Sequence, residues 1–261
     1  MVPLWAPIGL LMVVFQVPSA LMLSLPVENG LAAEYASRRA SRHLQRSADE
    51  AFICQTARMS IILYGSPRSR TMRVLWMAAE LSLEFEHVPC EFDDPALKTP
   101  EFLELNPAAA IPTLVDGDFA LSESLAINLY LAKRYGSAGS APLYPDTLQA
   151  EAEAIRWTLF AQGHLEPWIQ KDAQLADLIR TIGDRATGMV EKSLGVLERV
   201  LTNSPWLLGQ TFTVADLNVA AVLSPSRASL LDLSRYPHAR RWLARCYERP
   251  AALAVRRRYQ A

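Results

Sequence analysis

Cysteine is scarce in this sequence, and the few cysteines stand far apart. Cys54, Cys90 and Cys246 are the only three among 261 residues. Their spacing fits no CxxC redox pair, no zinc-ligand set and no disulfide framework of a small secreted domain. We therefore expect no metal site, and we expect the protein to work in a reducing compartment, the cytoplasm.

The chain also lacks an excess of charge of either sign. Its 26 basic and 27 acidic residues give a formal net charge of −1. Proteins that bind nucleic acid through its phosphates usually carry a basic surplus, so no nucleic-acid partner is expected. With 51% hydrophobic residues, the chain is typical of a globular protein and is long enough for two modest domains.

The N-terminal segment has no charged side chain before Glu28. Its length alone would allow a membrane span, but four prolines interrupt it, no basic residues precede it, and its best cleavage site is poor. We interpret residues 1–58 as a disordered or dispensable extension rather than a secretory signal. One alternative stays open: residues 1–27 are an anchor, and the basic residues at 38–46 keep the remainder on the cytoplasmic side.

From residue 59 to residue 136, short strands alternate with helices. An apolar strand at 61–64 ends in the turn Gly65-Ser66-Pro67, and apolar residues at helical spacing follow it. A second strand near 85–92, a short helix near 100–105, a hairpin around Asp116-Gly117 and a helix from Ser122 come next. This order predicts an α/β domain with a mixed sheet and an antiparallel edge.

The second half contains no strand pattern. Residues 137–146 are small, Gly-rich and Pro-rich, which is typical of a linker between domains. Residues 147–261 then show amphipathic helices at roughly 148–171, 173–202, 214–223 and 237–249, with a kink expected at Pro167. The sequence TVAD at 213–216 has the form of a capping box. The sequence therefore predicts an all-α second domain.

Polar groups gather where the first strand passes into the first helix. A helix start offers free backbone N–H groups and a partial positive charge, so an anion is favoured there, and the hydroxyl of Ser69 can donate to it. Ile111-Pro112 enters the next strand at a place suited to a cis peptide, beside which a peptide-like ligand can pair. Glu123-Ser124 at the following helix start can hold an α-amino acid end. Together these features predict a ligand with a thiol, a peptide backbone and an amino-acid end.

Four motifs in this order and spacing resemble the cytosolic glutathione S-transferase family, and the resemblance covers about Ser60 to the C-terminus. They read YGSPRS at 64–69, NP at 106–107 followed by IPTL at 111–114, ESLAI at 123–127, and TVAD at 213–216. The resemblance implies a thioredoxin-like N-terminal domain that binds glutathione, an all-helical C-terminal domain with a pocket for a hydrophobic substrate, and a homodimer. The implied activity is conjugation of the glutathione thiolate to small hydrophobic electrophiles.

The resemblance also implies roles for single residues. Ser69 matches the activating hydroxyl of the serine-type classes, as in bacterial-like members. The backbone of Ile111 beside cis-Pro112 matches the contact to the cysteinyl part of glutathione. Glu123 and Ser124 match the contact to its γ-glutamyl end.

Two departures from the family pattern affect this assignment. Residues 108–110 are alanines where many relatives place polar or basic side chains, so the glycyl carboxylate lacks a partner there, and Lys98 or Arg70 could substitute. Arg68 and Arg70 also flank Ser69 more densely than is usual, which could strengthen thiolate stabilisation or bind an acidic substrate. Arg73, on the helix face, is expected to pair with a carboxylate or to snorkel.

In the helical domain, Trp157, Phe160 and His164 fall at helical spacings. Most such stripes are core, but clefts between domains are commonly aromatic, so we predict that these residues bind the substrate.

Three alternatives stay open. Ser69 could be only a helix cap, with Tyr64 as the rival activating hydroxyl. The same fold could support a glutathione-dependent reductase, dehalogenase or isomerase. The protein could also be a non-catalytic module that binds glutathione or hydrophobic ligands.

Overall fold

The computed structural model describes residues 61–136, 142–169 and 173–259, and the side chains of residues 173–186 lie outside the description. Residues 59–261 form one compact unit. The predicted N-terminal extension, with the anchor alternative at residues 1–27, lies outside the described residues. None of the helices in the described ranges combines the length and the apolar character that a bilayer crossing requires.

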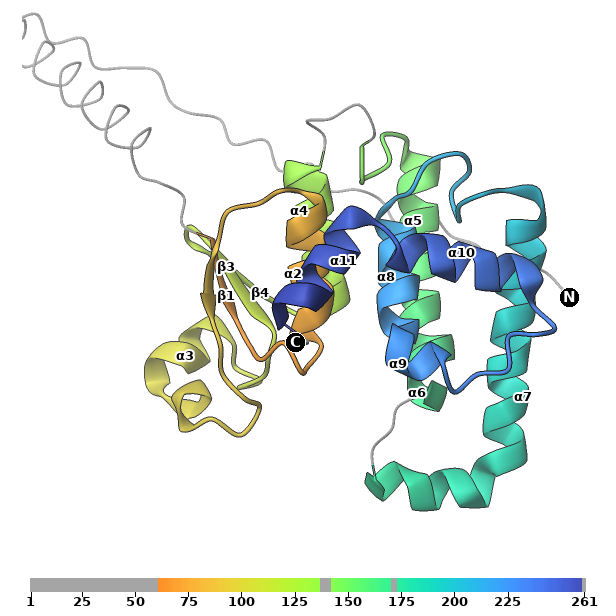
Figure 1. Cartoon of the computed structure of the whole chain (residues 1–261). Helices are drawn as coiled ribbons and strands as arrows, with labels where there is room; N and C mark the ends of the chain where they lie inside the picture. The colour runs from red at the N-terminus through yellow and green to blue at the C-terminus, as the bar shows by residue number, and fades with distance from the viewer. Residues whose placement is uncertain (1–60, 137–141, 170–172, 260–261) are drawn as a thin grey trace, which may run out of the picture. The chain divides into compact units, whose positions relative to one another are not determined.

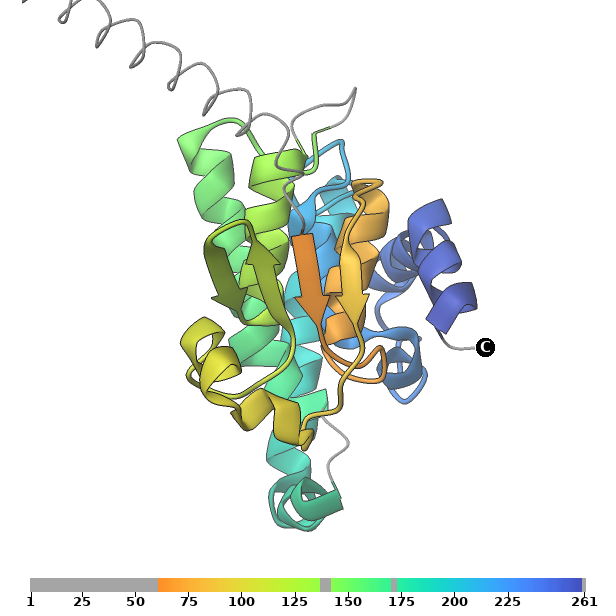
Figure 2. The ribbon, with the colours of Figure 1, turned by 90° about the vertical axis from the view of Figure 1, so that its left-hand side faces the viewer.

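A four-stranded mixed sheet forms the first half. Its strands are β1 (Ile61–Tyr64), β2 (Glu86–Val88), β3 (Thr113–Asp116) and β4 (Phe119–Ser122), in the order β2-β1-β3-β4. β2 runs parallel to β1, whereas β3 is antiparallel to both β1 and β4 (Figure 2). Gly117 turns the β3–β4 hairpin with a φ of 62°, which glycine adopts without strain. The predicted mixed sheet with an antiparallel edge is confirmed.

Helices α2 (Thr71–Glu80) and α4 (Ser124–Tyr135) pack on one face of the sheet (Figure 1). Their apolar residues are spaced three and four apart, so each helix presents one continuous apolar face. That face is buried, with Met77 and Ile127 fully covered. The 3-10 turn η1 (Pro95–Lys98) and helix α3 (Pro100–Leu105) connect β2 to β3, and Thr99 caps α3 by accepting from the N–H of Phe102.

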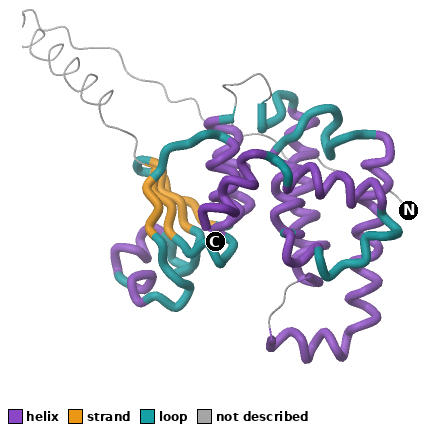
Figure 3. Tube along the Cα trace, viewed as in Figure 1, coloured by secondary structure: helices purple, strands orange, loops and turns teal. Residues whose placement is uncertain are grey.

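The second half is helical, and all the strands of the described part lie in the first half (Figure 3). Its elements are α5 (Leu148–Phe160), η2 (Ala161–Leu165), α6 (Glu166–Ile169), α7 (Ala173–Asn203), α8 (Val214–Leu223), α9 (Pro225–Ala228), α10 (Pro237–Tyr247) and α11 (Pro250–Tyr259). The helix predicted at 148–171 widens into a π-turn at η2. Pro167 has no N–H to donate to the carbonyl of Gly163, so a departure from regular α-helix is expected just there.

Helix α8 is the buried centre of this half. The predicted capping box is present at its start, with Thr213 and Asp216 bonded reciprocally. Asp216 is fully buried, and it also accepts from the N–H of Leu207 at 2.9 Å and from the indole N–H of Trp242 at 2.8 Å. One carboxylate therefore holds the start of α8, the preceding loop and α10 together.

Polar contacts fix the helical half against the sheet half. Asn128 of α4 donates to Asn218 of α8 at 2.8 Å, and Arg249 forms a two-pronged ion pair with Glu80 of α2 at 2.7 Å for each contact. At the predicted linker, Leu143 and Tyr144 are buried, and the carbonyl of Leu143 accepts from the N–H of Val214 at 2.8 Å. The position of α8 and α11 relative to the β1–α2 loop is thereby set.

Candidate functional site

The loop between β1 and α2 folds around a glycine. Gly65 has a φ of 138°, and a Cβ atom there would lie 2.1 Å from the Thr71 hydroxyl oxygen and 3.2 Å from the Cβ of Ile111. Only glycine therefore allows this close approach. The approach brings the start of α2 and the Ile111-Pro112 bond to the same end of the sheet, where Tyr64 also pairs with Thr113.

Ser69 is half-buried in this loop, two residues before the first residue of α2. Its hydroxyl donates to the carbonyl of Ser66 at 2.7 Å and accepts from the backbone N–H of Thr71 at 3.1 Å. The Thr71 hydroxyl lies 2.8 Å away and either oxygen can be the donor. Ser69 therefore caps the first turn of α2.

Capping does not use the proton of Ser69. A serine hydroxyl has one proton and two lone pairs. The lone pairs can accept from the amide and the hydroxyl of Thr71, while the proton faces the Ser66 carbonyl and can turn toward a ligand instead. The two roles expected for Ser69, cap and hydrogen-bond donor, are thus compatible.

Tyr64, the rival hydroxyl, packs edge-on against Phe102 of α3, with ring centroids 5.4 Å apart. It takes part in the packing between β1 and α3.

The Ile111-Pro112 peptide bond is cis, as the sequence predicts. The loop before it is held by Asn106, whose amide donates to the carbonyl of Ala110 and to the hydroxyl of Thr113, each at 2.9 Å. Pro112 is buried and Ile111 is half-buried.

Glu123 precedes α4 with a φ of 69°, a left-handed conformation that is uncommon outside glycine. Such outliers cluster at ligand-binding positions, because the surrounding fold must maintain them. Glu123 is exposed, whereas the neighbouring Ser124 is buried. Because Ser122 pairs with Thr113, these two residues lie next to the cis-Pro112 strand.

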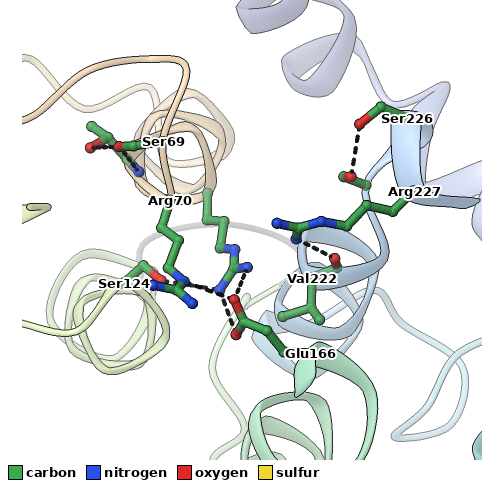
Figure 4. Close-up of polar contacts among 10 residues, drawn as sticks. Ser69, Arg70, Ser124, Glu166, Val222, Ser226 and Arg227 are labelled. Atoms are coloured by element: carbon green, nitrogen blue, oxygen red, sulfur yellow. Dashed lines mark hydrogen bonds and ion pairs between the residues drawn. The ribbon is translucent and has the colours of Figure 1, made fainter. Parts of the chain in front are cut away.

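An ion-pair network lies next to the start of α2, and it includes Arg73, which was expected to pair or to snorkel; its partner could not be predicted from the sequence. Arg73 of α2 and Glu166 of α6 are both buried and pair through two contacts, Nη2 to Oε1 at 2.7 Å and Nη1 to Oε2 at 3.2 Å. Arg70 Nε adds a contact to the same Oε1 at 2.7 Å, and Arg73 Nη1 reaches the Ser124 hydroxyl at 3.4 Å (Figure 4). Burial alone would raise the pKa of Glu166, but the hydrogen bonds and charges of Arg73 and Arg70 hold it at about 2.

The two residues expected to bind a carboxylate are placed differently. Arg70 has a half-exposed side chain whose Nε is bonded to Glu166. Lys98 is exposed at the end of η1, and no hydrogen bond or ion pair joins it to the residues that the structure describes.

A cavity of about 630 Å³ opens beside Ser69. It lies between the start of α2, the α8–α9 corner and helix α11. Its walls combine apolar and aromatic side chains with arginines, and its lining includes Ser69, Arg70, Arg73, Trp76, Ala221, Ser224, Arg227, Tyr247, Val255, Arg256 and Tyr259. The loop between β1 and α2, which carries Ser69, therefore faces a space large enough for a small organic substrate.

Two family models match the chain on either side of the predicted domain boundary. Residues 59–133 match the glutathione S-transferase N-terminal domain, and residues 181–250 match the glutathione S-transferase C-terminal domain. The chain belongs to the glutathione S-transferase family.

Individual relatives agree with this assignment. Glutathione S-transferase 3 of Zea mays is 36% identical over 207 residues, which cover 72% of this chain and 90% of that protein. Glutathione S-transferase D7 of Drosophila melanogaster is 34% identical over 183 residues, covering 69% and 81%. The crystal structure of glutathione transferase URE2P6 from Phanerochaete chrysosporium, in complex with oxidized glutathione, has a TM-score of 0.67 and 25% identity, covering 78% and 97%. The protein is thus a glutathione transferase, and the predicted thioredoxin-like plus all-α fold is confirmed.

The aromatic residues predicted to bind substrate lie elsewhere in this glutathione transferase. Trp157 is fully buried, packed edge-on against Phe160, and does not reach the cavity beside Ser69. Phe160 stacks on His164 with centroids 5.4 Å apart, and both line a separate surface hollow of about 450 Å³. The placement of Trp157 does not support the predicted role, because helical spacing identifies the apolar face of α5, and Trp157 on that face packs into the core.

Proposed function

We propose that the chain conjugates the thiolate of glutathione to a small electrophile and that Ser69 stabilises the thiolate. The observation that carries the proposal is the position of the Ser69 hydroxyl, at the start of α2 and on the wall of the cavity. In the reaction, the thiol proton passes to solvent and the sulfur forms a bond to an electrophilic carbon. The electron pair of the broken bond leaves with the leaving group. The proposal assigns the enzyme to the serine-type transferases.

The physical basis is a lowered thiol pKa. A free thiol has a pKa of about 8.5, so only a few per cent is thiolate at neutral pH. Lowering that pKa by about two units requires roughly 2.7 kcal/mol of differential stabilisation. A hydroxyl hydrogen bond to an anion and the partial charge at a helix start can together supply it.

The remaining contacts to glutathione follow the sequence expectations. We propose that the backbone at Ile111 and cis-Pro112 pairs with the cysteinyl part, and that Glu123 and Ser124 hold the γ-glutamyl end. The left-handed backbone of Glu123 supports this assignment. The glycyl carboxylate is assigned to Lys98 or to the terminal nitrogens of Arg70.

The test is a titration of bound glutathione, followed by its thiolate absorbance against pH on the full chain. We expect the bound thiol to ionise about two units below free glutathione. Turnover of a small aryl halide should accompany the lowered pKa. Binding without turnover would favour a non-catalytic module, and a chain that binds no glutathione contradicts the proposal.

We also propose that the protein is a homodimer that works in the cytoplasm, and we expect the dimer to form through α5 and β4. Exposed apolar residues on these elements are Leu148 at 78%, Leu159 at 64%, Phe119 at 46% and Ile155 at 40%. Leu148, Ile155 and Leu159 are seven and four residues apart, so they share one face of α5. Uncovered apolar faces of this kind mark association surfaces.

Leu159→Glu should therefore shift the protein from dimer to monomer in sedimentation-velocity measurements, because a charge would be buried without a partner at the interface. Leu230→Glu is the matched control, since Leu230 is 60% exposed but lies outside α5 and β4. A wild-type protein that sediments as a monomer at micromolar concentration contradicts the dimer.

A further inference from the structure

The cavity beside Ser69 carries charge of one sign. Its described lining contains no aspartate or glutamate but includes the arginines Arg68, Arg70, Arg73, Arg227 and Arg256. A concave site with basic walls and apolar surroundings focuses a positive potential inside it. The chain as a whole has a net charge of −1, so this is a local property of the cavity.

The carboxylate that pairs with the cavity arginines Arg70 and Arg73 does not neutralise the cavity. Glu166 lies behind the wall and is bonded to both Arg70 and Arg73. The negative charge of Glu166 is thus shared between the guanidinium groups of Arg70 and Arg73. The positive charge of Arg227 adds to this excess.

Arg227 is one of the cavity arginines that no carboxylate pairs with among the residues the structure describes. Its side chain is half-buried, and its Nη1 donates to the backbone carbonyl of Val222 at 2.9 Å. Within the described part of the chain, no carboxylate pairs with it. Burial lowers the pKa of Arg227, and the positive charges of Arg73 and Arg70 lower it further, with Glu166 opposing. An arginine stays protonated nonetheless, so the site gains from an incoming anion.

The side chain of Arg227 points toward the start of α2, so its charge lies on the side of the cavity where the reaction is proposed to take place. Figure 4 shows its side chain extending from α9 toward the side on which Arg70 and Glu166 lie. The hydroxyls of Ser224 and Ser226, 3.3 Å apart, stand at the same corner of α8 and α9. Trp76, Val255 and Tyr259 supply apolar wall for the body of a ligand.

We propose that the electrophile accepted by this cavity bears a carboxylate, which Arg227 binds while Ser69 holds the thiolate of glutathione. The inference rests on the proposed function and names its substrate class. A carboxylate suits a guanidinium because the two groups can form paired, charge-assisted hydrogen bonds. The substrate is thus a small acid with an apolar body, which narrows the class of small hydrophobic electrophiles that the family resemblance implies.

Glutathione itself has carboxylates, so the source of the anion must be decided. Of the residues assigned to glutathione, Ile111, Pro112 and Glu123 do not line the cavity, whereas Ser69 and Arg70 do. The cavity therefore extends from the sulfur position toward α9 and α11. We assign the carboxylate at Arg227 to the second substrate.

The test compares two aryl chlorides that differ only in charge, 4-chloro-3,5-dinitrobenzoate and 4-chloro-3,5-dinitrobenzamide. In both reactions the carbon–sulfur bond forms, the carbon–chlorine bond breaks, and chloride leaves with the electron pair. Each kcat/KM is divided by the uncatalysed rate constant of the same compound with glutathione. We expect the wild-type protein to favour the benzoate by about tenfold at low salt, and Arg227→Met to abolish this preference.

Two further variants sharpen the comparison. Arg227→Lys keeps the charge and should retain part of the preference. Arg240→Met removes an exposed arginine of α10 that does not line the cavity, and it should keep the full preference. If Arg227→Met does not fold, three other results test the inference. They are a preference of the wild-type protein for the benzoate, the loss of that preference at about 0.5 M salt, and its partial retention in Arg227→Lys.

The failures are distinguishable. Equal normalised rates for the two compounds in the wild-type protein overturn the inference and leave the transferase function intact. A preference that survives in Arg227→Met overturns it too, and a raised KM for glutathione in that variant would then assign the carboxylate to glutathione. Turnover of neither compound overturns the proposed function together with the inference.

Discussion

Replacing Ser69 by alanine is expected to lower the rate of glutathione conjugation by up to about 100-fold at pH 6. The alanine removes the hydroxyl that faces the cavity, so the pKa of the bound thiol should return toward that of free glutathione, about 8.5. A rise of two units leaves about one hundredth of the thiolate at any pH below both values. The rate gap should close above about pH 9, where glutathione ionises without help. Thiolate absorbance and kcat/KM, each measured against pH, check both statements.

Two variants separate catalysis from folding. Ser69 also caps α2, so its loss should cost about 1 kcal/mol of stability. Thr147→Ala removes a comparable cap, since the Thr147 hydroxyl accepts from the N–H of Ala150 at the start of α5, away from the cavity. It should cost similar stability and leave the rate unchanged, while Ser69→Thr keeps a hydroxyl and should keep much of the rate. If the thiol of bound glutathione titrates identically in the wild-type and Ser69→Ala proteins, Ser69 is only a helix cap.

The features predicted correctly from the sequence depend on local chemistry. Gly65 and Gly117 mark turns, Thr213 and Asp216 bond to each other's backbone across one turn, and Ile111-Pro112 is a proline-specific bond. Each signal needs only residues within a few positions of each other. The α/β order and the hairpin edge then follow, because short connections leave few ways to arrange the strands.

The features that could not be predicted from the sequence depend on contacts between residues far apart in the chain. Arg73 and Glu166 are 93 positions apart, and nothing local indicates that both are buried. Helix α11 was not predicted either, since it begins at Pro250, which both ends the preceding helix and suits the first position of a new one. Without α11 and α9, the sequence could not place Arg227 and Arg256 on the cavity wall, and the pocket was assigned to Trp157 instead.

The buried network makes the second large prediction. Glu166→Gln should lower the free energy of unfolding by about 3 kcal/mol at pH 7, because it leaves the buried guanidinium of Arg73 without its counter-charge. The control is Glu153→Gln, which removes an exposed ion pair with Arg156, each side chain about half exposed. That variant should cost less than about 1 kcal/mol. Urea unfolding of both variants provides the measurement. Equal losses in the free energy of unfolding would show that the buried network stabilises the fold no more than an exposed ion pair does.

The pH dependence of the same variant identifies the carboxylate as the cause. The pKa of Glu166 falls from 4.5 to about 2 in the folded protein. A group with a lowered folded-state pKa contributes stability above its unfolded value and loses it as the pH falls toward the folded value. The wild-type advantage over Glu166→Gln should therefore be constant from pH 5 to pH 8 and shrink as the pH drops from about 4.5 toward 2. An advantage that grows in acid would contradict the ion pair.

Since Arg73 also reaches Ser124, a raised KM for glutathione in Glu166→Gln would extend the role of this network from the fold to the binding of the γ-glutamyl end.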